Sequence, residues 1–99
     1  MRIILSLRAE AEIEDKFEYG AERFGDEVAE HTFSRVRHMI FQTLPAQPEA
    51  ATYDEDRDLF ERVIPRTPFV VFYRYDADAK EITVLSLPGQ SEDRDSFEG

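Results

Sequence analysis

The chain has 99 residues, with 12 lysines and arginines against 22 aspartates and glutamates, which gives a formal net charge of −10. This length fits one domain, and a hydrophobic content of 41% indicates a folded chain rather than a disordered one. The charge argues against free nucleic acid as a direct partner, because phosphate contacts use several basic residues, and the absence of cysteine excludes disulfides and thiolate chemistry.

The first half of the chain is predicted to form a strand and two helices. Residues 1–5 are apolar, and Ser6 stands where a helix N-cap is needed. Apolar residues then recur at spacings of four and three over residues 8–24, which predicts an amphipathic helix. Gly25 and Asp26 read as a stop followed by a new cap, so a second helix is predicted to end near Leu44, before Pro45. Its expected inner face consists of Val28, Thr32, Val36, Met39, Ile40 and Leu44.

The second half of the chain is predicted to be mainly strands. Residues 45–59 have the composition of an acidic loop, and residues 60–64 read as a short strand. Residues 69–75 and 82–87 are apolar and β-branched or aromatic, which predicts a hairpin, although the link at 76–80 lacks the usual glycine. We therefore expect an α+β fold, in which a two-helix antiparallel hairpin packs on a small, mostly antiparallel four-stranded sheet. The predicted domain spans residues 1–88, and an acidic C-terminal tail follows at 89–99.

Candidate catalytic groups are few in this sequence. His31 and His38 fall on nearly the same helix face, but no third metal ligand is spaced to join them, so we expect no metal and no cofactor. No carboxylate is set apart in an apolar environment, and the four glycines form no phosphate loop. No signal-peptide pattern or membrane-span run occurs, so we expect a cytoplasmic protein without a membrane partner.

Three arginines are the remaining candidates for a site. Arg62 and Arg66 precede the strand at 69–75, and Arg74 lies near its end, so adjacent antiparallel strands could bring all three to one surface. They could pair with the acidic loop, or they could form a cationic patch for an anionic partner, since guanidinium groups bind phosphate and carboxylate with paired donors. Arg74 alone could also be a strand-end arginine whose stem lies on aromatic neighbours.

A pattern across nearly the whole chain resembles the RelE/ParE superfamily of toxins from type II toxin–antitoxin systems. The residues that carry the resemblance are Leu5-Ser6 with Ala9 and Ala11, Phe17-Glu18-Tyr19, Leu44-Pro45, Arg62, the run Pro68 to Arg74, and Ile82-Thr83-Val84-Leu85. The resemblance implies a compact α+β toxin that a cognate antitoxin wraps and neutralises. Associated functions are growth inhibition and plasmid stabilisation.

Two activities compete within that superfamily. RelE-like members are metal-independent, ribosome-dependent mRNA endoribonucleases, and Arg74 matches the arginine that stabilises the cleaved phosphate. However, the loop at 49–58, where such enzymes carry lysines, has none here, and the tail has one arginine and is acidic. We therefore expect a ParE-like inhibitor of DNA gyrase that acts by protein–protein binding, with a non-toxic antitoxin-binding module as a further alternative. The expected target-binding residues are Arg62, Arg66, Tyr73, Arg74, Arg94 and Phe97.

Overall fold

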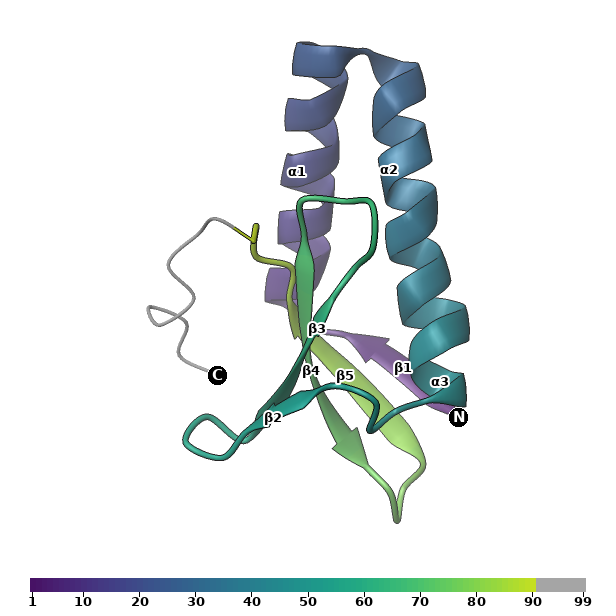
Figure 1. Cartoon of the computed structure of the whole chain (residues 1–99), viewed down its shortest axis with the longest axis vertical. Coiled ribbons are helices and arrows are strands. Elements are labelled where there is room, and N and C mark those ends of the chain that lie inside the picture. The colour runs from purple at the N-terminus through teal and green to yellow at the C-terminus, as the bar shows by residue number, and fades with distance from the viewer. Residues whose placement is uncertain (91–99) are drawn as a thin grey trace.

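The structure, a computed structural model, describes residues 1–90, in which two long helices pack against a five-stranded sheet (Figure 1). The elements are β1 (Arg2–Leu5), α1 (Leu7–Phe24), α2 (Asp26–His38), η1 (Met39–Thr43), α3 (Leu44–Ala46), β2 (Thr52–Asp54), β3 (Leu59–Val63), β4 (Val70–Asp76) and β5 (Glu81–Ser86). The predicted α+β class is confirmed. The sheet has one strand more than predicted, because β2 forms inside the segment that was expected to be a loop.

The strand order of the sheet is β1-β5-β4-β3-β2. The neighbours from β5 to β2 are antiparallel, and β1 alone runs parallel to its neighbour β5. A parallel pair needs a crossover connection, and here the helices and the strands β2 to β4 all lie between β1 and β5 in the chain. As a result, the start of α1 lies beside the end of β5, and the closed end of the helical hairpin extends beyond the strands (Figure 1).

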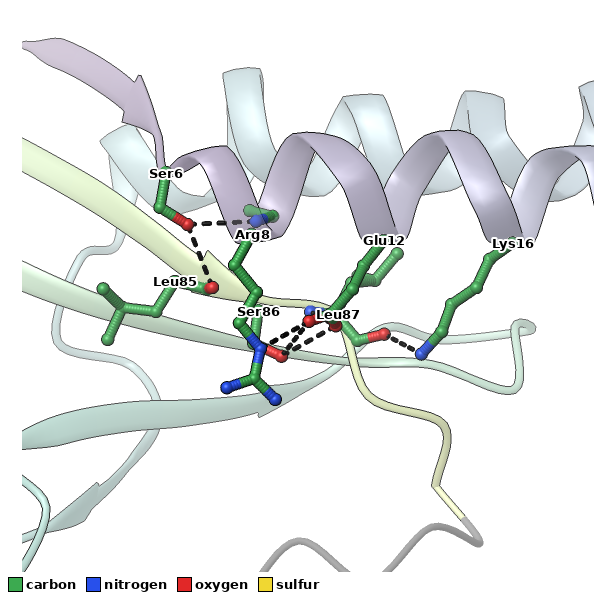
Figure 2. A network of polar contacts seen from close by, with 8 residues as sticks. Ser6, Arg8, Glu12, Lys16, Leu85, Ser86 and Leu87 are labelled. Carbon is green, nitrogen blue, oxygen red and sulfur yellow. Dashed lines mark hydrogen bonds and ion pairs between the residues drawn. The ribbon is translucent and has the colours of Figure 1, made fainter. Parts of the chain in front are cut away.

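Both predicted helix boundaries around Ser6 and Gly25 are confirmed. The Ser6 Oγ accepts a hydrogen bond from the Ala9 amide at 3.0 Å and donates to the Leu85 carbonyl at 3.0 Å (Figure 2). Gly25 has φ 92° and ψ 158°, a conformation that residues with a Cβ rarely adopt. It is itself the N-cap of α2, so Asp26 is the first helical residue and not the cap that was predicted.

The second helix departs from the prediction at both ends. Its buried face begins with Ala29 and Phe33, whereas Val28 is 50% exposed, so the predicted inner stripe is one position off near the hairpin end. At the other end, α2 passes into the π-helical turn η1, in which the Leu44 amide donates to the Met39 carbonyl. Pro45 does not end the helix, because it lies in the first turn of α3, where no amide donor is needed.

Strand β4 is buried on both faces of the sheet. Val71 and Tyr73 belong to the core beneath the helices, and Val70 and Phe72 pack with Leu59 on the opposite face. The hairpin link that lacks glycine is closed in another way: the Asp76 carboxylate accepts from the amides of Asp78 and Ala79, each at 3.1 Å, and Lys80 adopts φ 52°.

Candidate functional site

Arg74 is held against the turn between β2 and β3. Its Nε donates to the Asp58 carbonyl at 2.8 Å, and its Nη2 donates to the Arg57 carbonyl at 3.2 Å. The turn is braced further by Asp54, whose carboxylate accepts from the amide and the Nε of Arg57 at 3.2 and 2.7 Å. These hydrogen bonds from Arg57 hold the pKa of Asp54 below its usual value. Two guanidinium nitrogens of Arg74 therefore bind the backbone of this turn.

A small hollow beside Arg74 is lined also by Glu49, Tyr53, Asp58 and Tyr75. The Tyr53 hydroxyl donates to the Asp58 carboxylate at 2.5 Å, and this hydrogen bond raises the pKa of Tyr53. Among the described residues that line the hollow, Arg74 is the single cation. A site that cleaves a phosphodiester needs a base, an acid and groups that stabilise a phosphate gaining charge. This hollow brings one arginine together with carboxylates and phenols.

Arg62 and Arg66 lie away from Arg74, so the prediction that the three share one surface is wrong. Arg62 is two residues from Phe60, so it lies on the same face of the sheet as Phe60, the face that packs beneath the helices. Arg74 directly follows Tyr73, which belongs to that same core, so Arg74 lies on the opposite face. Pairing with the acidic loop is also not observed among residues 1–90, because Arg62 reaches only Gln47 Oε1, at 3.5 Å. Arg62 and Arg66 instead line a hollow with Arg35 and His38 of α2.

Tyr73 is fully buried rather than displayed. Its hydroxyl donates to the Pro48 carbonyl at 2.8 Å, and its ring stacks on Phe60 with 5.3 Å between ring centres. Burial raises the pKa of Tyr73 to about 12. In this arrangement the side chain anchors the segment that follows α3. The remaining two predicted target-binding residues, Arg94 and Phe97, lie outside the described residues.

An apolar groove lies at the closed end of the helical hairpin, and the sequence prediction missed it. Its volume is about 530 Å³, and it is lined by residues of both helices and of the turn before β4, among them Tyr19, Gly20, Phe24, Val28, Phe33 and Phe69. Val28 was assigned to the inner face of the second helix, yet it is 50% exposed, and Phe24 at the end of α1 is 61% exposed. They extend the apolar stripes of their helices past the end of the sheet, where no strand covers them.

A polar network joins α1 to the end of β5, and it too was not predicted. Glu12 accepts from Ser86 Oγ at 2.8 Å and from the Leu87 amide at 3.0 Å, and it pairs with Arg8 Nε at 2.7 Å (Figure 2). One turn further on, Lys16 donates to the Leu87 carbonyl. The amphipathic pattern over residues 8–24 gives no sign that Glu12 differs from the other acidic residues of α1.

His31 and His38 are both exposed on α2. Within residues 1–90, no three histidine, aspartate or glutamate side chains gather as a metal site would require. No helix in this range is long and apolar enough to cross a membrane.

Solved structures with this arrangement are bacterial toxins in complex with antitoxins. The chromosomal ParDE system from P. aeruginosa contains a chain with TM-score 0.69 and 19% identity, covering 90% of this chain and 95% of that one. RelBE2 from Mycobacterium tuberculosis matches with TM-score 0.60 and 13% identity, over 89% and 95% of the two chains. The E. coli RelBE complex matches with TM-score 0.56 and 16% identity, over 93% and 98%. The fold is therefore that of the RelE/ParE toxins.

The sequence narrows this class to one family. Residues 3–94 match the family described as "ParE toxin of type II toxin-antitoxin system, parDE". The chain belongs to the ParE toxin family. No protein with a curated function matches the sequence.

Proposed function

We propose that this chain is a toxin that inhibits DNA gyrase by protein–protein binding and is neutralised by a cognate antitoxin. The observation that carries the proposal is the set of hydrogen bonds that Arg74 makes to two backbone carbonyls. No other described residue that lines the hollow beside Arg74 is cationic. Cleavage of RNA would require further groups to neutralise the phosphate. The net charge of −10 also disfavours RNA as a ligand and favours a polypeptide target.

The exposed groove at the end of the helical hairpin supports an antitoxin partner. Tyr19, Phe24 and Val28 leave an apolar surface that an antitoxin segment could cover. The helix faces around it carry many exposed carboxylates, so the segment should be apolar with interspersed lysine or arginine. The solved structures with the same fold are toxin–antitoxin complexes, which agrees with this proposal. A strongly acidic neutralising segment whose affinity does not change with salt would contradict it.

The choice of target is tested with the purified full chain in two assays. In the gyrase assay, we expect loss of supercoiling or accumulation of gyrase-linked DNA breaks. In the ribosome assay, we expect mRNA on translating ribosomes to stay intact. In cells, induction without the antitoxin should arrest growth with a DNA-damage response rather than with loss of translation.

The main alternative is the ribosome-dependent endoribonuclease. Tyr53 and Glu49 lie in the same hollow as Arg74 and are the groups that an activity centred on Arg74 would use. Site-specific mRNA cuts that disappear in Arg74→Ala and Tyr53→Phe, but persist in the control Tyr19→Phe, would establish this alternative. Normal growth on induction, together with tight antitoxin binding, would indicate a non-toxic binding module.

A further inference from the structure

A second hollow of about 530 Å³, hereafter the basic hollow, lies between α2 and the turn that joins β3 to β4. Its basic side chains are Arg35, His38, Arg62 and Arg66, and no carboxylate lines it among residues 1–90. In a chain with 22 acidic and 12 basic residues, such a grouping runs against the overall charge. Like charges that share a surface repel one another, so the grouping destabilises the free protein unless an anion joins it.

The arginines of the basic hollow have donors that no residue in the range 1–90 accepts from. Arg35 and Arg66 form no ion pair with any residue in the described range. Arg62 makes one long contact, from Nη2 to Gln47 Oε1 at 3.5 Å. Its Nη1 is buried and has no hydrogen-bond partner within the described chain. Buried donors are nearly always satisfied in folded proteins, so this nitrogen indicates an unfilled bonding position.

The backbone on both sides of the basic hollow is irregular. On the helical side, α2 changes into the π-turn η1, whose residues Met39 and Thr43 line the hollow. Such π-turns inside helices are frequent at functional sites. On the other side, Arg66 adopts φ 60° in a tight turn closed by the bond from the Thr67 amide to the Ile64 carbonyl. Glycine would fit this conformation without strain, and the arginine places a guanidinium there instead.

We propose that the basic hollow is an oxyanion site that takes the phosphate group of a small ligand. Three guanidinium groups can each offer parallel N–H donors to the oxygens of one phosphate, which suits a compact dianion. Glu30 lies one helical turn before Ser34 of the lining and is exposed. An extended nucleic acid would reach beyond the hollow onto a chain whose net charge is −10, so the ligand is a single phosphate group, either free or carried by a small molecule.

The test measures ligand binding by the purified full chain in phosphate-free buffer at constant ionic strength. Inorganic phosphate and adenosine monophosphate are titrated separately, with adenosine and sodium chloride as matched controls. A ligand that binds only the folded state raises Tm, by about 5 °C once its concentration exceeds Kd roughly tenfold. If inorganic phosphate binds as tightly as adenosine monophosphate, the free ion is the ligand. If the nucleotide binds more tightly than phosphate, the ligand is a phosphorylated small molecule.

Variants assign the binding to the basic hollow. Arg62→Gln and Arg66→Gly should each raise Kd at least about tenfold, the loss expected when one charge-assisted contact is removed. Arg66→Gly also relieves the left-handed conformation, so its loss of binding cannot be ascribed to unfolding. The control Arg37→Gln lies on α2 outside the hollow, where Arg37 pairs with Glu30 at 3.4 Å, and it should bind as the native chain does.

Three results would overturn the site. One is a Tm shift from sodium chloride equal to that from phosphate; another is unchanged affinity in Arg62→Gln. The third is stronger protection by succinate than by phosphate, which would indicate a carboxylate of a partner protein as the natural occupant. None of these measurements contains gyrase, ribosomes or antitoxin, so their outcome is independent of the toxin target.

Discussion

The carboxylate of Glu12 and the hydroxyl of Ser86 lie 2.8 Å apart, although 74 positions separate them in the chain. The same carboxylate accepts from the Leu87 amide, so one side chain fixes the end of β5 against α1. Ser86 is buried, and water therefore cannot replace the lost acceptor easily. Glu12 thus has a structural role that its exposed neighbours on α1 do not share.

Replacing Glu12 should destabilise the fold measurably. Glu12→Ala leaves a buried hydroxyl and an amide without their acceptor, which should lower the free energy of unfolding by about 1–3 kcal/mol. Ser86→Ala removes only one of the two donors and should cost less. Urea denaturation of both variants measures the difference. The control is Glu14→Ala on an exposed position of the same helix, and equal stability losses in Glu12→Ala and Glu14→Ala would contradict the role.

Alkaline pH should destabilise the chain through Tyr73. Its pKa is about 12 in the folded chain against 10.0 for a free tyrosine, so the folded state keeps a proton that the unfolded state loses. The corresponding stabilisation is complete below pH 10 and disappears as the pH rises through 12, with an upper limit of about 2.7 kcal/mol. Unfolding free energies measured between pH 9 and pH 12 should fall more steeply in the native chain than in Tyr73→Phe.

Two controls accompany the Tyr73 measurement. Tyr73→Phe also loses the hydrogen bond to the Pro48 carbonyl, which should cost about 1 kcal/mol at neutral pH. Tyr19→Phe, at a side chain that is 59% exposed, should keep both the native stability and the native pH slope. Absorbance at 295 nm should show Tyr73 ionising last of the four tyrosines, and simultaneous ionisation of all four would refute the assignment.

The two glycines of the helical hairpin should respond in opposite directions to alanine. At Gly20, a helical position, an added Cβ would lie 3.8 Å from the Ala29 Cβ, an ordinary contact, so Gly20→Ala should stabilise the fold by about 0.5–1 kcal/mol. At Gly25 the added Cβ has open space but the backbone has φ 92°, so Gly25→Ala should cost about 1–3 kcal/mol. Thermal unfolding of the two variants tests this, and a shift of the same sign in both would contradict it.

Local sequence patterns predicted the elements well because their causes are local. The hydroxyl of Ser6 and the missing Cβ of Gly25 act within a few residues, and the two-residue period of any strand accounts for Val71 and Tyr73 on one face and Val70 and Phe72 on the other. The grouping of the site residues depends instead on contacts between residues far apart in the chain. Strand alternation puts Arg62 and Arg74 on opposite faces once β3 and β4 pair in register, and that register was not encoded in the spacing of the arginines. The grouping of Arg62 with Arg35 required the packing of α2 beside the β3–β4 turn.

Arg74 should stabilise the β2–β3 turn whether or not it contacts a target. Arg74→Ala removes two hydrogen bonds to turn carbonyls, which should cost about 1 kcal/mol and expose the turn amides to exchange. Arg74→Lys retains the charge but cannot reproduce the planar fork, so it should restore only part of the protection. Hydrogen exchange at residues 54–59 measures the effect directly. The control Arg2→Ala, at an exposed arginine on β1, should leave the exchange of this turn unchanged. Native protection in Arg74→Ala would show that the turn does not need these hydrogen bonds and that the guanidinium is available to bind a target.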